Sequence, residues 1–406
     1  MNNLVQKRIL LGVTGGIAAY KSAELIRRLR EQGAEVRVVM TRAACEFITP
    51  LTMQALSDRP VHTELLDPGA EVAMGHIELA RWCDVVLVAP ASANFLARLA
   101  HGQADDLLST LCLATSAPLL LAPAMNQQMW INEATQTNMA ILQDRGIHLF
   151  GPAEGDQACG ETGPGRMLEP GELLIHVNAA FKTDLLTQKR LLVTAGPTRE
   201  AIDPVRYISN QSSGRMGYAV ARAALEAGAE VTLVSGPSVL APPDRVRLIS
   251  VLTAEQMRTA VMENIEDLNI FIAAAAVADY RCEHIARQKL KKKDKANEIT
   301  LTLQKTPDIL AEVASLPRAP FTVGFAAETE RLEKNAMQKL RTKQLDMIAA
   351  NKVGKDLGFD HEENALSVFW QDGSIELVRT SKEKLARQLV RVIAEQYNAK
   401  STTQAH

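Results

Sequence analysis

The stretch RILLGVTG at residues 8–15 recurs, with changes, as RLLVTAG at residues 190–196. Each is a short apolar strand that runs into a glycine. Each leads through a helical stretch to a second apolar strand, at residues 33–40 and 228–235. Strand, glycine turn, helix and parallel strand form the βαβ unit of nucleotide-binding folds. The sequence therefore predicts an α/β protein with two doubly wound, mainly parallel-sheet, Rossmann-like domains.

The two copies differ in length at their first turn. Arg8 and Arg190 are 182 positions apart, whereas Gly33 and Gly228 are 195 apart, so the second copy carries about 13 extra residues there. This turn follows the carboxyl end of a strand, where open α/β sheets bind ligands. The insertion contains DPVRYISN at residues 203–210, which we expect to take part in chemistry.

Composition is that of an ordinary globular protein. The chain has 406 residues, 47% hydrophobic and 23% charged, enough for two or three domains. A net charge of −2 and 4% aromatic residues give no basis for nucleic-acid or membrane partners. The five cysteines have no metal-ligand spacing, as in a reducing compartment, and the first residues lack the apolar core of a signal peptide. We therefore expect a cytoplasmic protein.

Polar clusters follow the buried strands of the first half. The strands at 84–90 and 118–123 end in Ala-Pro, followed by ASAN at 91–94 and by AMN at 124–126. Such residues suit a flat ligand packed against backbone, or serve only as turns and helix caps. The glycines of TGGIAAYK, residues 14–21, either expose amides to a phosphate at a helix start or form a tight turn.

Two further residues of the first half are catalytic candidates. His76 precedes a helical pattern, and its role is either structural or catalytic. Cys159 lies in QACGETGPGRM, residues 157–167, whose three glycines and one proline predict a mobile loop. The thiol is either reactive or incidental. The polar connection at 181–188 then places the domain boundary near residue 188, giving domains 1–188 and 189–406.

The second half offers candidates for nucleotide binding. The segment FIAAAAVADY, residues 271–280, predicts a buried strand that ends in small residues, with Asp279 just beyond it. The alanines either admit a base or ribose to the backbone or only pack the sheet. A lysine cluster in a polar loop serves as a triphosphate clamp or is simply solvated: Lys289, Lys291, Lys292, Lys293 and Lys295.

These motifs match known families. The segments GVTGGIAAYK (12–21), PASAN (90–94), PAMN (123–126) and ACG (158–160) resemble the flavin-dependent cysteine decarboxylases. DPVRYISN, followed by SSGRMG at 212–217, resembles phosphopantothenate-cysteine ligase. Together they resemble the bacterial bifunctional coenzyme A biosynthesis proteins over nearly the whole chain. Two departures are mild: Thr14 stands in place of Ser, and Leu290 in place of Ile.

For the first half, the resemblance implies a flavodoxin-like, flavin-binding decarboxylase domain that forms 4′-phosphopantetheine from phosphopantothenoylcysteine. The flavin oxidises the substrate thiol and later returns the hydride, so that it ends unchanged. His76 would assist at the reacting carboxylate or thiol, Asn126 would hold the carboxylate, and Cys159 would protonate the enethiol carbon. The expected FMN contacts are Thr14, Gly15, Gly16, Thr41, Ser92 and Asn94.

For the second half, the resemblance implies a ligase that joins 4′-phosphopantothenate to cysteine through an acyl-cytidylate. Lys289 would stabilise the charge on departing pyrophosphate, while Asn210 and Arg206 would orient the activated acyl group. The turn at Ser212, Ser213 and Gly214 would bind the substrate phosphate. Mg²⁺ would arrive on the triphosphate, with Asp279 as its candidate ligand. The expected CTP contacts are Ala273, Ala274, Ala275, Asp279, Lys289, Pro307, Asp308, Ile309, Leu310, Phe325, Lys339 and Lys343.

The expected partners are these small molecules and further copies of the chain, in a trimer-based homo-oligomer built through the first domain, with dimerising second domains. Two other functions remain open from sequence. A flavoprotein oxidoreductase would consume an external electron carrier, and a nucleotide-sensing regulator would release no CO₂.

Overall fold

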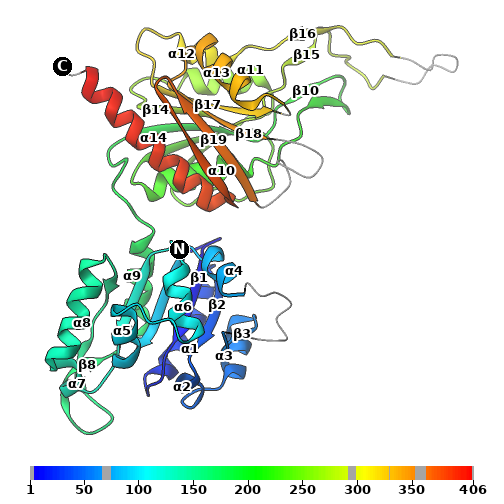
Figure 1. The fold of residues 1–406 in the computed structure, drawn as a ribbon. Coiled ribbons are helices and arrows are strands. Elements are labelled where there is room, and N and C mark those ends of the chain that lie inside the picture. Colours follow the sequence, from blue (N-terminus) through cyan, green and yellow to red (C-terminus); the bar gives the residue numbers. More distant parts are fainter. Residues whose placement is uncertain (1–3, 66–74, 291–298, 329, 353–362, 405–406) are drawn as a thin grey trace. The chain divides into compact units, whose positions relative to one another are not determined.

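The computed structural model describes residues 4–65, 75–290, 299–328, 330–352 and 363–404. The chain forms two compact units, Met1–Phe181 and Lys182–His406 (Figure 1). Each unit contains its own parallel sheet and its own hydrophobic cores. The prediction of α/β architecture with two doubly wound, mainly parallel sheets is confirmed.

The division between the units falls after Phe181 instead of at residue 188. The backbone N–H of Thr183 donates to the carbonyl of Glu226, and that of Leu186 donates to the carbonyl of Ala227, both at 2.8 Å. The Leu186 side chain is buried in the main core of the second unit. The polar connection is therefore the first segment of the second unit, because its backbone and one leucine are fixed there.

The sheet of the first unit has six parallel strands in the order β3-β2-β1-β4-β5-β6. The order reverses between β1 and β4, which creates a crevice at their carboxyl ends. The strands, with the separate hairpin β7-β8, are β1 (Arg8–Val13), β2 (Glu35–Met40), β3 (Val61–His62), β4 (Val85–Ala91), β5 (Leu119–Pro123), β6 (His148–Leu149), β7 (Ala153–Asp156) and β8 (Thr162–Arg166).

Helices cover both faces of this sheet, which explains why its central strands are apolar throughout. Side chains of α1, α3 and α9 pack on one face, and those of α4, α5, α6 and α8 pack on the other. The helices are α1 (Ala19–Glu31), α2 (Arg42–Cys45), α3 (Pro50–Ser57), α4 (Gly75–Trp82), α5 (Ala93–Ala100), α6 (Leu107–Ala114), α7 (Gln127–Ile131), α8 (Glu133–Asp144) and α9 (Pro170–Ala180).

The second unit has an eight-stranded sheet in the order β13-β12-β9-β14-β17-β18-β19-β20. Strands from β13 to β18 are parallel, and β19 and β20 complete the sheet in antiparallel pairing. These strands are β9 (Arg190–Ala195), β12 (Glu230–Ser235), β13 (Arg247–Ser250), β14 (Ile270–Ala273), β17 (Phe321–Glu328), β18 (Met347–Lys352), β19 (Glu363–Trp370) and β20 (Gly373–Ser381).

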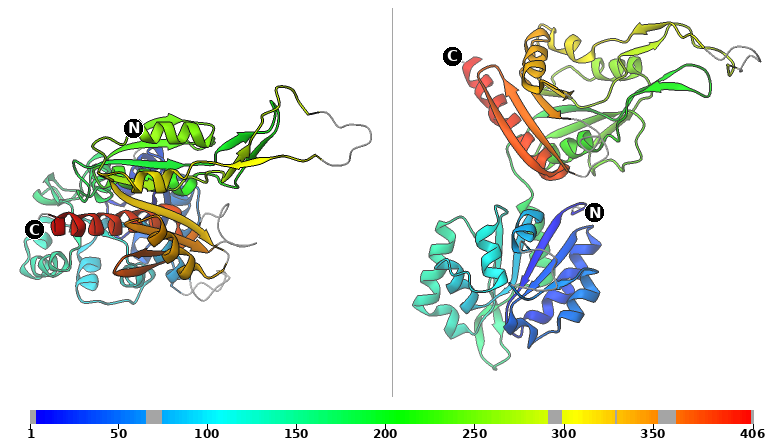
Figure 2. Two further views of the ribbon diagram at one scale, coloured as in Figure 1. Left: turned by 90° about the horizontal axis from the view of Figure 1, so that it is seen from above. Right: turned by 45° about the vertical axis from the view of Figure 1, so that its right-hand side comes forward.

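Helices α10 and α14 pack on one face of this sheet, and α11 and α12 pack on the other. The helices are α10 (Arg215–Glu226), α11 (Ala254–Met262), α12 (Ile309–Ala314), α13 (Leu332–Thr342) and α14 (Lys382–Gln404). Two antiparallel ribbons project from the carboxyl-end edge of the sheet (Figure 2): β10 (Arg199–Ala201) with β11 (Tyr207–Ser209), and β15 (Tyr280–Cys282) with β16 (Leu303–Lys305).

Across the helices of the described residues, none has the length and apolar character that crossing a bilayer requires.

The segment before β9 gives a first prediction. Leu186 is 1% exposed and Leu185 is 42% exposed. Leu186→Ala should lower the free energy of unfolding of the second unit by about 2–5 kcal/mol, since it removes buried methyl groups and leaves a cavity. Leu185→Ala is the matched control and should stay within about 0.5 kcal/mol. Denaturant unfolding of the full chain measures both free energies. Equal effects of the two substitutions would contradict the packing of Leu186 in the core of the second unit.

Candidate functional sites

The first unit contains a cavity of about 1020 Å³ where the strand order reverses. Its walls come from the loop after β1, the starts of α2 and α5, and the β7-β8 hairpin. The cavity brings together all six residues predicted to contact FMN: Thr14, Gly15, Gly16, Thr41, Ser92 and Asn94. Asn126 and Cys159 line the same space.

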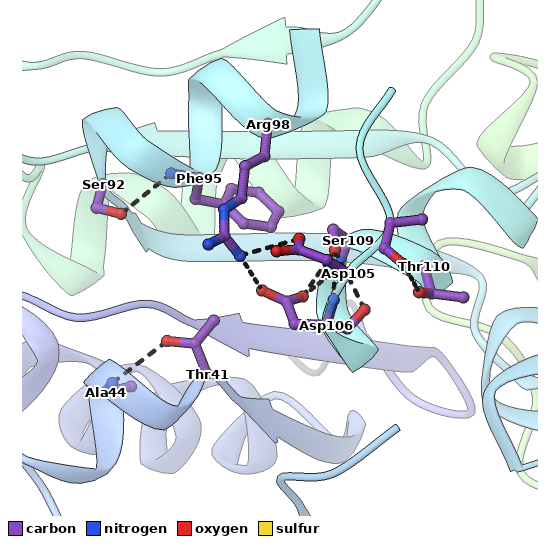
Figure 3. A network of polar contacts seen from close by, with 10 residues as sticks. Thr41, Ala44, Ser92, Phe95, Arg98, Asp105, Asp106, Ser109 and Thr110 are labelled. Atoms are coloured by element: carbon purple, nitrogen blue, oxygen red, sulfur yellow. Dashed lines mark hydrogen bonds and ion pairs between the residues drawn. The ribbon is translucent and has the colours of Figure 1, made fainter. Parts of the chain in front are cut away.

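Two helix-capping hydroxyls face this cavity. Thr41 Oγ1 accepts the N–H of Ala44 at 3.2 Å, and Ser92 Oγ accepts the N–H of Phe95 at 3.3 Å (Figure 3). In both, the oxygen caps a helix while the O–H remains able to donate. Phosphate oxygens need such donors, and helix starts favour negative charge. The capping and ligand-binding interpretations of these positions are therefore compatible.

Thr14 has a different position from the two capping residues. Its buried Oγ1 donates to the Pro90 carbonyl at 2.7 Å and accepts the Ser92 N–H at 2.9 Å. One hydroxyl thus joins the ends of β1 and β4 across the crevice. Serine could make the same two bonds, which explains why the departure at this position is mild.

Gly15 allows close backbone packing beside the cavity. A Cβ there would lie 2.6 Å from the Cβ of Ala43, whereas Gly16 has open space around it. The loop after β1 therefore lies directly against the start of α2. Together with the donors of Thr41 and Ser92, this cradle fits a flavin phosphate.

Cys159 and Asn126 meet at one end of the cavity. Asn126 Nδ2 lies 3.4 Å from Cys159 Sγ and donates to Glu161 Oε2 at 2.7 Å. Gln157 Oε1 accepts from Asn126 Nδ2 at 3.3 Å and from the Gln127 N–H at 3.0 Å. An exposed thiol, an amide and a carboxylate are thus grouped on one short hairpin and the start of α7.

The prediction of an irregular loop at residues 157–167 is wrong in part. Residues 162–166 form β8, paired with β7, and Cys159 lies in the turn between them. Gly165 has φ +142°, and a side chain there would clash with the Met125 carbonyl. The Gly165 carbonyl also accepts the Met125 N–H at 2.9 Å. Gly165 therefore allows two backbones to approach closely. From composition alone, the same glycine-rich segment predicts a mobile loop.

His76 is not brought to this cluster within the described chain. It lies in the first turn of α4, half-buried, and does not line the cavity. Its catalytic role remains a prediction.

The cavity wall also contains an ion-pair network that the sequence does not predict. Arg98 Nη1 donates to Asp105 Oδ1 and Asp106 Oδ2, both at 3.1 Å (Figure 3). Asp106 also caps α6 by accepting the Ser109 N–H at 2.8 Å. Arg98 follows Asn94 by four residues, so both lie on one helix face. This four-residue spacing is the sequence feature that could have pointed to Arg98 as a residue of the cavity wall.

In the second unit, the alanines leave the sheet earlier than predicted. Strand β14 ends at Ala273, and the following backbone bonds to the end of β9 and to the loop after it. Ala274 N–H donates to Thr194 O at 3.2 Å, and Ala276 N–H donates to Gly196 O at 2.9 Å. The predicted continuation of the strand through the alanines to just before Asp279 is therefore wrong. Small side chains permit this close run of two loops.

Two other segments meet the same loop. Asn210 Nδ2 donates to the Val277 carbonyl at 2.8 Å. The Thr306 N–H donates to the Asp279 carbonyl at 3.0 Å, which places Pro307 beside it. The inserted turn, the alanine segment and residues 307–310 thus converge at the carboxyl ends of the strands. Phe325, in β17, lies near that end of the sheet.

Two of the three predicted CTP lysines, Lys339 and Lys343, already have acidic partners. Lys343 Nζ lies 2.8 Å from Asp308 Oδ2, and Lys339 Nζ lies 2.7 Å from Glu328 Oε1. Asp308 also caps α12. Ile309 is buried and Leu310 is half-buried, and both pack into hydrophobic cores, so the Ile309 side chain cannot face a ligand.

The predicted phosphate turn lies at the start of α10. Gly214, with φ +77°, is the N-cap, and its N–H donates to Ser212 Oγ at 3.3 Å. The Ser213 carbonyl accepts from Ser238 Oγ at 3.2 Å. The Ser238 side chain, from the loop after β12, thus holds the backbone of this turn.

Lys289 is exposed, and the other predicted lysines, from Lys291 to Lys295, lie outside the described residues. Asp279 is also exposed. Among the residues described, no group of three or more His, Cys, Asp or Glu side chains is arranged to hold a metal ion.

Arg206 is bound to a buried neighbour in the inserted turn. Its Nε and Nη2 donate to Asp203 Oδ2 at 2.9 and 2.6 Å. Hydrogen bonds from the Arg206 guanidinium, and then from backbone amides, hold the pKa of Asp203 far below its usual range, against the opposing effect of burial. Asp203 thus takes two of the five N–H donors of the Arg206 guanidinium, and the Leu290 carbonyl takes a third.

Fold and sites together define a two-domain α/β protein with a large cavity where the strand order of the first sheet reverses and a cluster of loops at the carboxyl ends of the strands in the second. Residues 1–182 match the family model described as Flavoprotein, and residues 186–397 match the DNA/pantothenate metabolism flavoprotein C-terminal domain.

Curated relatives extend this match over the full length. The Coenzyme A biosynthesis bifunctional protein CoaBC of Vibrio cholerae is 57% identical, covering 98% of this chain and 100% of its own. The protein of the same name from Escherichia coli is 52% identical, covering 98% and 99%. A crystal structure of the C-terminal domain of such a protein is 38% identical, covers 53% of this chain and 100% of its own, and has a TM-score of 0.46. The chain belongs to the family of coenzyme A biosynthesis bifunctional proteins, which confirms the resemblance in its motifs.

The glycine in β8 gives a second prediction. Gly165→Ala should lower the free energy of unfolding of the first unit by about 1–3 kcal/mol, because the new methyl group displaces either the hairpin or the Met125 backbone. Gly171→Ala is the control, since a Cβ there has no atom within 4 Å. Denaturant unfolding measures both. If Gly165→Ala matched Gly171→Ala, the close approach would not matter.

Proposed function

We propose that this chain catalyses two successive steps of coenzyme A biosynthesis. The second unit ligates 4′-phosphopantothenate to cysteine through an acyl-cytidylate formed from CTP. The first unit then decarboxylates the product to 4′-phosphopantetheine. Family membership over nearly the full chain supports both reactions. The observation that carries the first is the grouping of Cys159 and Asn126 in one cavity with the six flavin-binding candidates.

In the first unit, the protein's part is to hold FMN and to place the substrate. Thr41 and Ser92 would donate O–H groups to the phosphate, and Gly15 and Gly16 would offer backbone amides. Asn94 would contact the remainder of the flavin. Bound FMN supplies the reversible two-electron acceptor that a cysteine carboxylate lacks.

Asn126 is arranged to bind a carboxylate. Its amide already donates to the carboxylate of Glu161 at 2.7 Å, and a substrate carboxylate would replace that partner. Cys159 Sγ, at 3.4 Å from the same amide nitrogen, then lies beside the carbon that loses CO₂. A thiol at that place can deliver the proton that the enethiol carbon needs. His76 would assist at the reacting carboxylate or thiol, although it does not line the cavity.

In the second unit, the CTP triphosphate would replace the carboxylates that now pair with two lysines. Lys339 and Lys343 would release Glu328 and Asp308 and bind phosphate oxygens. Lys289 is exposed and would stabilise the charge that develops as pyrophosphate departs. Mg²⁺ would enter with the triphosphate near Asp279. The remaining CTP contacts would be backbone contacts at 273–275 and 307–310, together with Phe325.

Asn210 and the turn at 212–214 would hold the acyl half of the intermediate. Asn210 is fixed against Val277, where the alanine segment passes. Ser212, Ser213 and Gly214 would bind the substrate phosphate at the start of α10, and Arg206 would use the two remaining guanidinium donors, on Nη1. The cysteine amine then displaces CMP from the acyl carbon.

We also propose a homo-oligomer, trimer-based through the first unit and with dimerising second units, in the cytoplasm. Ile17, Tyr20 and Met129 line the FMN cavity yet are exposed, so another copy could cover them. None of the five cysteines, all in the described part of the chain, forms a disulfide, as a reducing compartment favours. The mass of the assembly in solution tests the oligomer.

Cys159→Ala tests the decarboxylase. The variant should release CO₂ from phosphopantothenoylcysteine but accumulate an enethiol that lacks two hydrogens of 4′-phosphopantetheine, because no proton reaches carbon. Burial raises the pKa of the Cys112 thiol to about 12, so Cys112→Ala should behave as wild type. CO₂ release and product mass are measured without NAD(P)H, which excludes an ordinary oxidoreductase if turnover continues. Wild-type yield of 4′-phosphopantetheine from Cys159→Ala would remove this role.

Lys289→Gln and Asn210→Asp test the two ligase steps. Lys289→Gln should release little pyrophosphate from CTP and 4′-phosphopantothenate. Asn210→Asp should release it and accumulate acyl-cytidylate even when cysteine is present. Lys334→Gln, at an exposed lysine of α13, is the control for loss of charge. Pyrophosphate assay and mass detection of the intermediate measure both steps. If Lys289→Gln formed acyl-cytidylate at the wild-type rate, the lysine cluster would not bind the triphosphate and would be only a solvated loop.

A further inference from the structure

The Asp203 carboxylate is the most heavily hydrogen-bonded group of the inserted turn. Its side chain is 0% exposed. Oδ1 accepts the N–H groups of Val205 and Arg206 at 2.8 and 2.9 Å. Oδ2 accepts Nε and Nη2 of Arg206 and, at 3.1 Å, the N–H of Leu290. Five donors thus converge on one carboxylate, and one of them lies 87 positions away in the chain.

Arg206 completes the connection to Leu290. Its Nη2 donates to the Leu290 carbonyl at 2.7 Å. Both backbone polar groups of Leu290 are therefore held by the same ion pair. A further bond, from the Ala286 N–H to the Ile202 carbonyl at 3.0 Å, fixes the chain a few residues earlier.

The residue next to this anchored backbone is Lys289, whose side chain is exposed. A lysine ammonium stands on a long flexible stem, so the place that it can reach depends on where its backbone is fixed. Asp203 also belongs to the same inserted turn as Asn210. Anchoring Leu290 to this turn therefore fixes the backbone of Lys289 relative to Asn210.

We infer that the Asp203–Arg206 pair is a positioning device for Lys289. It holds the backbone at Leu290 so that the Lys289 ammonium stands over the departing pyrophosphate. The inference deepens the proposed ligase function and rests on the role of Lys289 in it. Asp203 and Arg206 would act through Lys289 during activation, and neither needs to contact CTP.

The negative charge at Asp203 is essential to this arrangement. An asparagine has only one acceptor oxygen, so in either orientation its NH₂ would face donors: the Arg206 guanidinium together with the Leu290 N–H, or the backbone N–H groups of Val205 and Arg206. The depressed pKa of Asp203 agrees with this geometry, because protonation would bring the same conflict. Asp203→Asn should therefore release Leu290 with little change in side-chain volume.

Asp203→Asn in the full chain tests the inference by three measurements. Hydrogen exchange of the peptide covering 283–290, without CTP, should become faster because the Leu290 N–H loses its acceptor. Pyrophosphate release should fall about 10- to 100-fold, as expected for a misplaced catalytic group. In a Lys289→Gln background the same substitution should change the remaining rate by less than about twofold, since residues that act as one unit are not additive.

Asp346→Asn is the matched control. Asp346 Oδ2 accepts the Thr322 N–H at 2.8 Å and so also joins two distant segments, but at the amino-terminal ends of β17 and β18. This variant should leave the exchange of 283–290 and the pyrophosphate rate unchanged. Decarboxylation by the first unit should be unchanged in every variant.

Three results would overturn the inference: unchanged exchange at 283–290, an unchanged pyrophosphate rate, or effects of Asp203→Asn and Lys289→Gln that multiply. If Lys289→Gln alone had no effect, the proposed function would fail instead, and hydrogen exchange would still report whether the anchor exists. If Asp203→Asn failed to fold, Arg206→Lys would replace it. That variant keeps the charge but cannot bridge Asp203 and the Leu290 carbonyl, and it should speed exchange in the same peptide.

Discussion

Parallel pairing of β-strands is the constraint on which both units depend. Parallel strands must all end at the same edge, so residues far apart in sequence become neighbours there. In the first unit, β1 and β4 pair in register and diverge beyond Val13 and Ala91. The Thr14 hydroxyl joins the two ends by bonds to Pro90 and Ser92. The cavity exists because the strand order reverses at this point.

The second unit uses the same edge but adds chain to it. The inserted turn, the alanine segment and the residues before α12 leave their strands and bond to one another. Asn210 reaches Val277, and Thr306 reaches Asp279. Asp203 then links the inserted turn to Leu290. Polar groups that the sheet cannot pair are thus satisfied by neighbouring loops, as buried polar groups must be.

Much of this fold was predictable from the sequence, since the apolar runs and their glycines specify buried parallel strands and their turns. The cavity residues were predictable in part, because Ser92 and Asn94 follow a strand and Cys159 and Asn126 stand in family motifs. Three expectations failed where tertiary contacts overrode local pattern. Gly165 lies in a strand, β14 stops at Ala273, and Leu186 belongs to the second unit. In each case a partner distant in sequence supplies the bond or the core.

The sequence by itself therefore determined which segments become strands and helices, because periodicity and glycine act within a few residues. It also determined the family, through motifs of contiguous residues. Only the tertiary structure decided which side chains meet: Asn126 with Cys159, Arg98 with Asp106, and Asp203 with Leu290. The physical reason is that hydrogen bonds and ion pairs depend on distance in space. No feature of the sequence around Asp203 or Leu290 indicates that the fold brings these two residues together.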